Sequence, residues 1–395
     1  MCDTLCVRRP DGTVFGKNSD RPPSEVQLVE WHDARPAGGS LRTQYLTIAD
    51  AGATALLGAR PEWLWGMEHG LNQHGVAIGN ERVFTVDDPD AQPPGLIGMD
   101  LVRLALERAT DARGAVELIG DLIVRYGQGG AADPVTGDAY FSSFLVADPG
   151  AAWTVESSGR DWVAREVTDR DAISNRITLD GCATGSVDSP STFDPQSWVR
   201  PDEWTVHADR RLASSRAALA TQPDFDARAM AGALRDHGGR RWGAPGDDTD
   251  TVPPPADQGP DGAGWTVCMH VRQLSTTTSS MIGWLDPAGH HRAWLAQGAP
   301  CVSVFVPVSA TGPTPAGLAD PMAWHRVARL RALVDATPDT LSEIRAVLDP
   351  LESALWEEAD DLAASAADPT LWGAFSRRAH QQADDVTRRL LDRLG

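Results

Sequence analysis

The chain has almost no lysine and very little asparagine. Of its 35 basic residues only Lys17 is a lysine, and the asparagines are Asn18, Asn72, Asn80 and Asn175. Arginine differs from lysine in shape and in how readily it loses a proton, and asparagine offers an uncharged donor and acceptor together. Positions that keep either residue are therefore candidates for a specific chemical task.

Several classes of protein are excluded by what else is missing. No stretch approaches the roughly 20 apolar residues of a membrane span, and the N-terminus has no basic segment followed by an apolar one, so no signal peptide is expected. A formal charge of -20 at pH 7 argues against binding of nucleic acid through a basic face. We expect a cytoplasmic protein with no membrane or nucleic-acid partner, and a homo-oligomer stays possible.

The cysteines show no pattern of a disulfide framework or a metal site. They are odd in number and scattered singly, at Cys2, Cys6, Cys182, Cys268 and Cys301. None lies at the spacing of a zinc motif from another cysteine or a histidine. Glu68, His69 and His74 form a second metal candidate, but their spacing matches no zinc motif either. The sequence therefore predicts no metal and no other cofactor.

The first residues predict a β-hairpin. Two β-prone runs lie within residues 3–18 and flank a turn at residues 10–12. Cys2 then begins the first strand, and the second strand returns to the same end of the sheet. The start of the chain is therefore expected beside Asn18 and Asp20.

Helices and strands follow in blocks along the chain. Residues 98–126 have the apolar spacing of two helices, with Asp111 as the N-cap between them. Strands return in the next segment, and the chain beyond Pro321 is predicted to be helical. Strands on both sides of a central helical region favour a layered α+β fold over a doubly wound sheet. We expect a main domain at residues 2–310 and a helical extension at residues 321–395 packed on it.

Cys2 would carry two functional groups once Met1 is removed. Cysteine is small enough at the second position to allow that removal, which leaves a thiol and a free α-amine on one residue. An α-amine has a pKa of about 7.7–8, close to the working pH that suits a general base. It can take the thiol proton while the sulfur attacks a carbonyl. This arrangement predicts an N-terminal nucleophile that needs no histidine.

Four further residues fit the chemistry around such a nucleophile. Asp20 could hold the amine through a charge-assisted hydrogen bond, and Lys17 could stabilise a thiolate. The acyl-transfer intermediate needs donors at its oxyanion, and the side-chain amides of Asn80 and Asn175 are uncharged donors. The alternative for each residue is structural: an ion pair in a turn for the first two, and turn asparagines for the others.

Several blocks of sequence together resemble the secernin branch of the C69 peptidases. They keep their order over residues 2–180, at Cys2-Asp3-Thr4-Leu5, Gly16-Lys17-Asn18-Ser19-Asp20-Arg21-Pro22, residues 65–81, residues 143–149 and Ile173-Ser174-Asn175-Arg176. The resemblance implies an αββα four-layer sandwich and hydrolysis of a C–N bond through a thioester. It implies Cys2 as nucleophile, Asp20 as amine anchor, and Asn80 and Asn175 as oxyanion donors. Related penicillin and bile-salt amidases carry arginine where this chain has Lys17.

Two residues are candidates for substrate binding. Trp65 begins one of the resembling blocks, and Arg272 could supply the later arginine that the related amidases use. The sequence therefore predicts a cysteine-nucleophile amide hydrolase, a dipeptidase or N-acyl amidohydrolase, acting on a small peptide or acyl-amide. Two alternatives stay open: acyl transfer through the same thioester, and a non-catalytic scaffold that binds a protein partner.

Overall fold

The computed structural model describes most of the chain. The described residues are 1–133, 135–180, 184–186, 189–190, 194–200, 203–221, 224–238, 264–271, 274–365 and 368–395. Within these ranges no helix is both long enough and apolar enough to cross a membrane.

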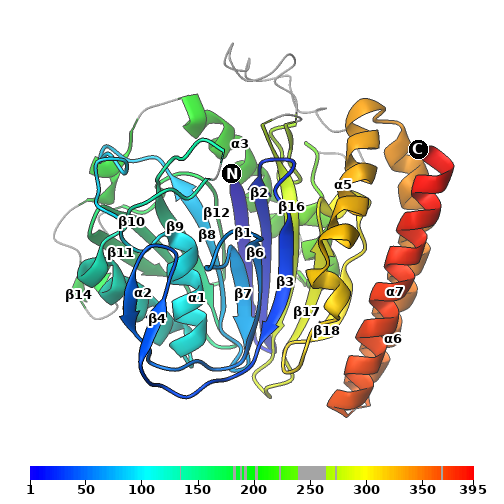
Figure 1. The fold of residues 1–395 in the computed structure, drawn as a ribbon, viewed down its shortest axis with the longest axis horizontal. Helices are drawn as coiled ribbons and strands as arrows, with labels where there is room; N and C mark the ends of the chain where they lie inside the picture. The colour runs from blue at the N-terminus through cyan, green and yellow to red at the C-terminus, as the bar shows by residue number, and fades with distance from the viewer. Residues whose placement is uncertain are drawn as a thin grey trace.

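Two antiparallel sheets lie face to face in the middle of the molecule (Figure 1). The first sheet contains, in spatial order, β12 (Arg170–Ile173), β1 (Cys2–Arg9), β2 (Gly12–Arg21), β16 (Ser275–Leu285), β17 (Arg292–Gln297) and β18 (Val306–Ser309), and β15 (His270–Val271) pairs with β16. The second contains β14 (Ser189–Pro190), β13 (Thr184–Ser186), β11 (Asp161–Glu166), β10 (Ala152–Ser158), β9 (Phe141–Ala147), β8 (Ala77–Val83), β7 (His69–Asn72), β6 (Leu56–Pro61) and β3 (Gln27–His32). A small hairpin is formed by β4 (Ser40–Arg42) and β5 (Thr47–Ala49).

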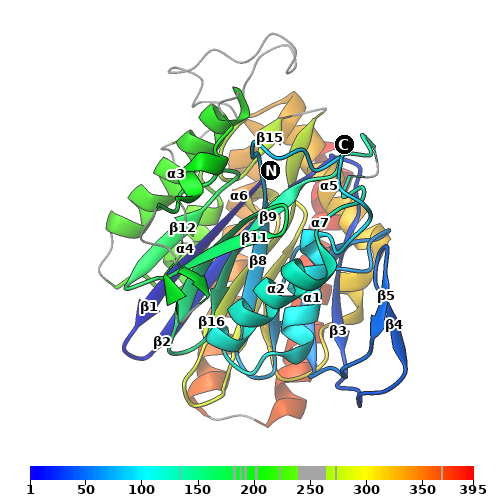
Figure 2. The ribbon, with the colours of Figure 1, turned by 90° about the vertical axis from the view of Figure 1, so that its left-hand side faces the viewer.

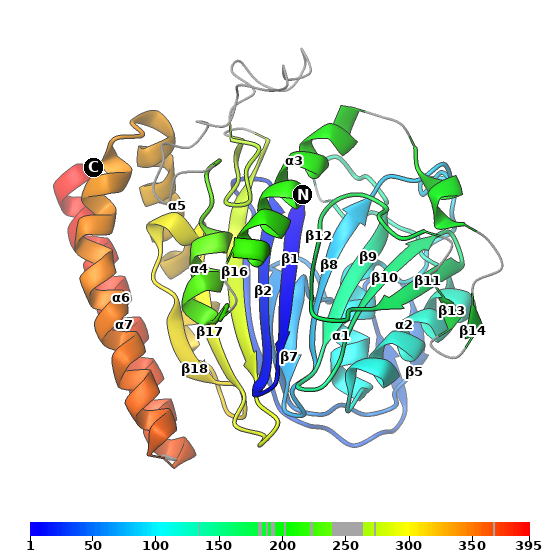
Figure 3. The same ribbon diagram turned by 180° about the vertical axis from the view of Figure 1, so that it is seen from behind.

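Helices cover the outer faces of both sheets (Figure 2). On the second sheet lie α1 (Gly98–Arg108) and α2 (Ala112–Tyr126), and on the first lie α3 (Glu203–Thr221) and α4 (Ala227–Leu234) (Figure 3). Beside β18 and β3 lie α5 (Pro321–Ala336), α6 (Thr340–Ala364) and α7 (Pro369–Leu394). Short 3₁₀ helices lie at Pro195–Trp198, Pro300–Val302 and Ala316–Ala319. The predicted α+β fold, a four-layer αββα sandwich with additional C-terminal helices, is confirmed.

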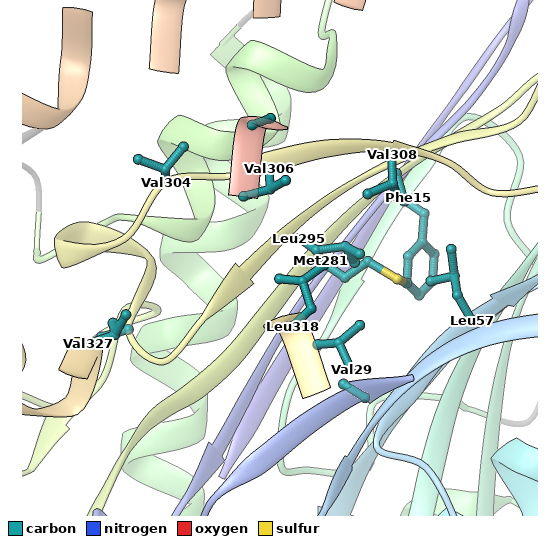
Figure 4. Close-up of a cluster of buried hydrophobic side chains, with 14 of the residues drawn as sticks. Phe15, Val29, Leu57, Met281, Leu295, Val304, Val306, Val308, Leu318 and Val327 are labelled. Carbon is teal, nitrogen blue, oxygen red and sulfur yellow. The ribbon is translucent and has the colours of Figure 1, made fainter. Parts of the chain in front are cut away.

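The core between the sheets is built from apolar side chains of both. Figure 4 shows Phe15 and Met281 of the first sheet beside Leu57 of the second. Each of these side chains is fully buried, and burial of one such side chain stabilises a fold by about 1.5–3 kcal/mol. The same cluster continues into α5, α6 and α7 through Leu330, Leu348 and Phe375. The proposed division at residues 310 and 321 stays a prediction.

The predicted hairpin at the start of the chain is confirmed. β1 and β2 pair in a register that sets Cys2 opposite Ser19 and Thr4 opposite Lys17. Gly12 begins β2 with a φ of 145°, and a Cβ there would lie 2.6 Å from the carbonyl oxygen of Leu285. Glycine is therefore required where β2 passes β16.

The two helices predicted at residues 98–126 are also confirmed, as α1 and α2. Asp111 is the N-cap of α2, since its side chain accepts a hydrogen bond of 2.8 Å from the Gly114 nitrogen. The chain beyond Pro321 is helical as predicted.

Candidate active site

A cavity of about 330 Å³ opens where β1 begins and β2 ends. Its lining brings together three of the five predicted catalytic residues, Cys2, Asp20 and Asn80. Other lining residues include Met1, Arg21, Glu68, Arg82, Phe84, Asp138, Tyr140 and Trp265. The hairpin therefore delivers the first residue of the sheet to the wall of a cavity.

Cys2 is fixed by backbone pairing and by alternation along β1. Successive side chains of a strand point to opposite faces. Thr4 donates a hydrogen bond to Glu81 of the second sheet, whereas the carboxylate of Asp3 receives one from Arg211 of α3. Cys2 shares the face of Thr4, so its side chain points toward the second sheet and the cavity.

The nitrogen of Cys2 donates a hydrogen bond of 2.8 Å to Asn175 Oδ1. The same oxygen accepts a bond of 2.7 Å from Arg211 Nη2, and Asn175 Nδ2 donates to the Arg82 carbonyl at 2.8 Å. Two donors at one atom and an acceptor at the other define how the amide is oriented. Asn175 therefore meets Cys2 as an acceptor, and its contacts do not support the predicted role of oxyanion donor.

Arg211 is a residue of the site that sequence reasoning missed. Its side chain is fully buried, and Nη1 donates to Asp3 Oδ2 at 2.6 Å and to the Cys2 carbonyl at 3.1 Å. Nη1 also lies 3.7 Å from Asp20 Oδ2. Arg272, predicted as a candidate for the later arginine, lies outside the described residues. Arg211 is the buried arginine that the structure sets beside Cys2.

Asp20 presents a carboxylate oxygen to this site. Oδ1 accepts a hydrogen bond of 2.7 Å from Thr277 Oγ1, whereas the buried Oδ2 has no hydrogen-bond partner within the described part of the chain. Burial raises the pKa of Asp20 to about 7, against the opposing charges of the N-terminus and Arg211. The predicted neighbourhood of Asp20 and the chain start is thus observed.

Met1 occupies one side of the cavity. Its α-amine donates to the Asp20 carbonyl at 2.9 Å, and its own carbonyl accepts from the Asp20 nitrogen at 2.9 Å. Its side chain packs against Trp265, Met269 and Val271. While Met1 is attached, the Cys2 nitrogen is an amide and part of the cavity is filled.

Lys17 lies behind Cys2 and does not line the cavity. Its buried ammonium is 3.3 Å from Glu81 Oε1 and donates to the Asn18 carbonyl at 3.2 Å. A Cβ on Gly79 would lie 2.4 Å from Lys17 Cδ, so glycine at position 79 makes room for the lysine stem. Lys17 is therefore a buried charge whose side chain packs against the backbone of Gly79.

Charges in this network act on the Cys2 thiol. Burial raises the pKa of Cys2, and the positive charge of Lys17 opposes that rise. Burial by itself lowers the pKa of Lys17, but the negative charges of Cys2 and Glu81 outweigh it and raise that pKa. Lys17 therefore stays charged, and its charge favours the thiolate form of Cys2. Its role in catalysis stays a prediction.

Asn80 and Arg82 lie two residues apart on β8, and both line the cavity. Asn80 Nδ2 donates to Met99 Sδ and to Ser142 Oγ, each at 3.5 Å. Its Oδ1 is buried and no described residue bonds to it. The side-chain amide of Asn80 is therefore weakly engaged at the cavity wall.

Trp65, predicted to bind substrate, lies elsewhere. Its ring centroid is 4.4 Å from the Arg103 guanidinium, and the side chain packs against the cluster between α1, α2 and the second sheet. The tryptophan that lines the cavity is Trp265. Trp65 is not among the residues that line the cavity, and its part in substrate binding stays a prediction.

The metal candidate at Glu68, His69 and His74 does not form a ligand cluster in the part of the chain that is described. His69 is buried with Nδ1 at 3.0 Å from Ser19 Oγ, and burial together with the Lys17 charge lowers its pKa. His74 is exposed. His69 is therefore a neutral hydrogen-bonding residue between the two sheets.

One family model matches part of this chain. The model of peptidase family C69 matches residues 65–184, in agreement with the family predicted from the sequence. The secernin branch within it stays a prediction.

Three solved structures are similar to this chain. Conjugated bile acid hydrolase from Clostridium perfringens has 11% identity and a TM-score of 0.44, with 75% of this chain and 89% of that chain covered. The Caenorhabditis elegans ortholog of N-acylethanolamine-hydrolyzing acid amidase has 11% identity and a TM-score of 0.35, with 71% and 92% covered. Penicillin V acylase from Agrobacterium tumefaciens has 11% identity and a TM-score of 0.38, with 80% and 84% covered. At these scores the likenesses carry no conclusion about activity.

The pair of Arg211 and Asp3 provides a test of the site's construction. Arg211→Met should lower the free energy of unfolding by about 3–5 kcal/mol, because it leaves the Asp3 carboxylate buried without its partner. Adding Asp3→Asn should recover part of this loss, with an interaction energy of about 1–3 kcal/mol in a double-mutant cycle measured by urea unfolding. Arg216→Met is the matched control on α3: its side chain is 45% exposed, and we expect a change within about 0.5 kcal/mol. Strictly additive effects of the two site variants would contradict the pairing.

The buried carboxyl of Glu81 predicts a pH dependence of stability. Burial raises the pKa of Glu81 from 4.5 to about 7, so between these values the folded state holds a proton that the unfolded state has released. The free energy of unfolding contributed by this group therefore falls as pH rises through that window. Glu81→Gln should make the pH dependence of urea unfolding shallower there, and the exposed control Glu62→Gln should not. An unchanged slope in Glu81→Gln would show that this carboxyl does not titrate as described.

Proposed function

We propose that this member of peptidase family C69 is a cysteine-nucleophile hydrolase of amide bonds, with Cys2 as the nucleophile after removal of Met1. The observation that carries the proposal is the position of the Cys2 nitrogen, held 2.8 Å from Asn175 Oδ1 beside the cavity. Removal of Met1 turns this nitrogen into a primary amine on the residue that carries the thiol. It also frees the part of the cavity that Met1 fills.

The amine supplies the base that a buried thiol requires. Because burial raises the pKa of Cys2, the thiol is protonated before attack. The amine takes this proton as the sulfur bonds to the substrate carbonyl carbon, and the carbonyl oxygen becomes an oxyanion. When the C–N bond breaks, the amine passes the proton to the leaving nitrogen and a thioester remains. The amine then takes a proton from the water that attacks the thioester and passes it to the sulfur as the C–S bond breaks, and a carboxylic acid leaves.

Two acceptors hold the amine in place for this transfer. Asn175 Oδ1 already receives the Cys2 N–H, and Asp20 Oδ2 is a buried acceptor with no other hydrogen bond among the described residues. Hydrogen bonds to both would direct the nitrogen lone pair toward the thiol of the same residue. Arg211 contacts both acceptors and acts as a positioning residue.

The Asn80 amide is the proposed oxyanion donor. Its Nδ2 faces only long contacts to Met99 and Ser142, so it loses little when it turns to a substrate oxygen. A donor that is held beside the reacting carbonyl stabilises the oxyanion more than water does, because it needs no reorganisation. Asn175 Nδ2 is bound to the Arg82 carbonyl and takes no part in this step.

Arg82 indicates a substrate that carries a carboxylate. Its guanidinium lies 4.8 Å from the Phe84 ring centroid and 5.3 Å from that of Tyr140, and Nη1 is 3.4 Å from Asp138 Oδ2. Its buried Nε has no hydrogen-bond partner in the described chain. Arginine binds carboxylates through paired N–H donors, and a cavity of about 330 Å³ suits a small ligand. We therefore propose a dipeptide or an N-acyl amino acid as substrate.

The remaining features of the proposal come from composition. We propose an enzyme that acts in the cytoplasm, without a redox or group-transfer cofactor, on free small molecules. A homo-oligomeric state remains a prediction.

The first test is selective alkylation of Cys2. After a brief, roughly stoichiometric exposure to a thiol alkylator near neutral pH, intact mass and peptide mapping should show Met1 absent and Cys2 alone modified. Cys6 is the internal control, because burial raises its pKa to about 12 and keeps it unreactive. Cys2→Ala should abolish labelling and lower turnover of dipeptides and acyl-amides by about 10³-fold or more.

Retention of Met1, or labelling of Cys2 no faster than labelling of Cys6, would contradict the assignment of Cys2 as the nucleophile. It would favour the scaffold alternative. Turnover in water labelled with heavy oxygen separates hydrolysis from acyl transfer, because only hydrolysis places the label in the released acid.

The second test concerns the carboxylate anchor. Arg82→Met should raise KM for a dipeptide with a free C-terminal carboxylate by roughly 10–100-fold, the loss of a charged hydrogen bond worth about 1.5–3 kcal/mol. The same dipeptide with an amidated C-terminus should be affected much less. Arg165→Met is the matched control, because this arginine lies on β11 outside the cavity lining. Equal effects on the free and the amidated dipeptide would contradict the anchor.

A further inference from the structure

A second group of reactive side chains lies buried behind the cavity. His237, Cys268, His270 and Cys301 each offer one ligand atom, and these atoms all lie within 4.8 Å of one another. His237, Cys268 and Cys301 are 0% exposed and His270 is 3% exposed. Two thiols and two imidazoles are thus gathered in a site sealed from water, and the catalytic mechanism uses none of them.

The distances fit one tetrahedral ion. His270 Nε2 lies 3.2 Å from Cys301 Sγ and 3.7 Å from Cys268 Sγ. Bonds of about 2.3 Å to sulfur and about 2.0–2.1 Å to nitrogen at tetrahedral angles set donor atoms about 3.3–3.8 Å apart. An ion at the centre would therefore reach these donors with only small adjustments of their side chains.

A carboxylate outside the cluster orients one of its histidines. His270 Nδ1 lies 2.7 Å from Asp335 Oδ1 of α5, so this nitrogen carries the proton and donates it to the carboxylate. The lone pair of Nε2 is then directed toward the two sulfur atoms. Histidine ligands of metal ions are held in this way by a carboxylate on the other ring nitrogen. The contact is a second observation that points to a ligand, independent of the gathering of four donors.

We propose that His237, Cys268, His270 and Cys301 bind one zinc ion with a structural role. Two thiolates and two imidazoles are a donor set typical of structural zinc, and four protein ligands leave no open position for catalysis. Calcium and magnesium require oxygen ligands, which these four residues do not supply. The spacing along the chain hides the site, because its ligands spread over residues 237–301.

The ion would join parts of the fold that lie far apart in the sequence. His237 follows α4, Cys268 precedes β15, and His270 is the first residue of β15. Cys301 lies in the 3₁₀ helix Pro300–Val302. Asp335 adds α5 through its contact with His270. Metal binding would therefore hold the helical layer, the first sheet and the C-terminal helices to one another.

This site connects with the Cys2 cavity through Met269, which lies between two ligands. Met269 donates from its nitrogen to Thr277 Oγ1 at 2.9 Å, and Thr277 Oγ1 donates to Asp20 Oδ1 at 2.7 Å. Trp265, three residues before Cys268, lines the cavity. If the proposed function holds, the zinc ion positions the carboxylate that anchors the amine and one wall of the substrate site.

Metal analysis of the full chain tests the proposal. Protein purified without chelator from zinc-supplemented medium should contain one zinc per chain by elemental mass spectrometry. Cys301→Ser and His237→Gln should retain about a tenth of that or less, whereas Cys6→Ser, which removes a buried cysteine outside the cluster, should retain all of it. Cobalt(II) in the wild-type protein should give thiolate-to-cobalt charge transfer and tetrahedral d–d bands. This last readout needs no variant to fold.

Several outcomes would overturn the site. Folded wild-type protein without stoichiometric zinc, or a cobalt spectrum without thiolate bands, would exclude it. A Cys268–Cys301 disulfide in non-reducing peptide maps would reject the zinc site and show that these two cysteines form a redox pair. The link to the cavity has its own test: zinc removal should slow Cys2 alkylation. If zinc is bound but its removal does not change the rate of Cys2 alkylation, the zinc site stands and its link to the cavity is rejected. If Cys2 does not react at all, the proposed function is rejected, and the zinc measurement is unaffected.

Discussion

The hydrogen bond from the Cys2 nitrogen to Asn175 Oδ1 depends on the position of Cys2, which is the first residue of β1, an inner strand of the first sheet. Chain ends of most proteins fray at the surface. Here β1 lies between β12 and β2, and it pairs with β2 from Cys2 onward and with β12 from Thr4 onward. The two sheets and the outer helices then bury these residues, and a terminal nitrogen acquires the fixed surroundings of a core residue.

Successive side chains of β1 point to opposite faces of the strand, so the charged groups of the site lie partly between the two sheets and partly between the first sheet and α3. Thr4 faces the second sheet and reaches the Lys17–Glu81 pair, whereas Asp3 faces α3 and meets Arg211. Buried charges are tolerated because each has a partner close by. Their fields converge on Cys2 from opposite faces of one strand. A strand thus concentrates more charge around its first residue than a surface loop could hold in place.

Local features were predictable from the sequence, and long-range contacts were not. The hairpin, α1 with α2 and the Asp111 cap follow from turn chemistry and apolar spacing within short windows. The rarity of lysine and asparagine drew attention to Lys17, Asn80 and Asn175, and the structure sets all three near Cys2 or its cavity. It could not show that Asn175 meets Cys2 through its oxygen, because the direction of an amide depends on partners distant in the chain. Arg211 had no compositional signal among so many arginines.

On the proposed function, the placement of Met1 couples activity to its removal. Met1 lines the cavity, its side chain packs against Trp265, and its carbonyl oxygen accepts a hydrogen bond from the Asp20 nitrogen. A single cleavage would create the base and vacate the binding space together, so an unprocessed molecule lacks both. On the proposed function, the active fraction of a preparation equals the fraction of molecules from which Met1 has been removed. An affinity tag ahead of Cys2 would hold the enzyme in this latent form, whereas one after α7, at the side of the molecule (Figure 1), would leave the cavity open.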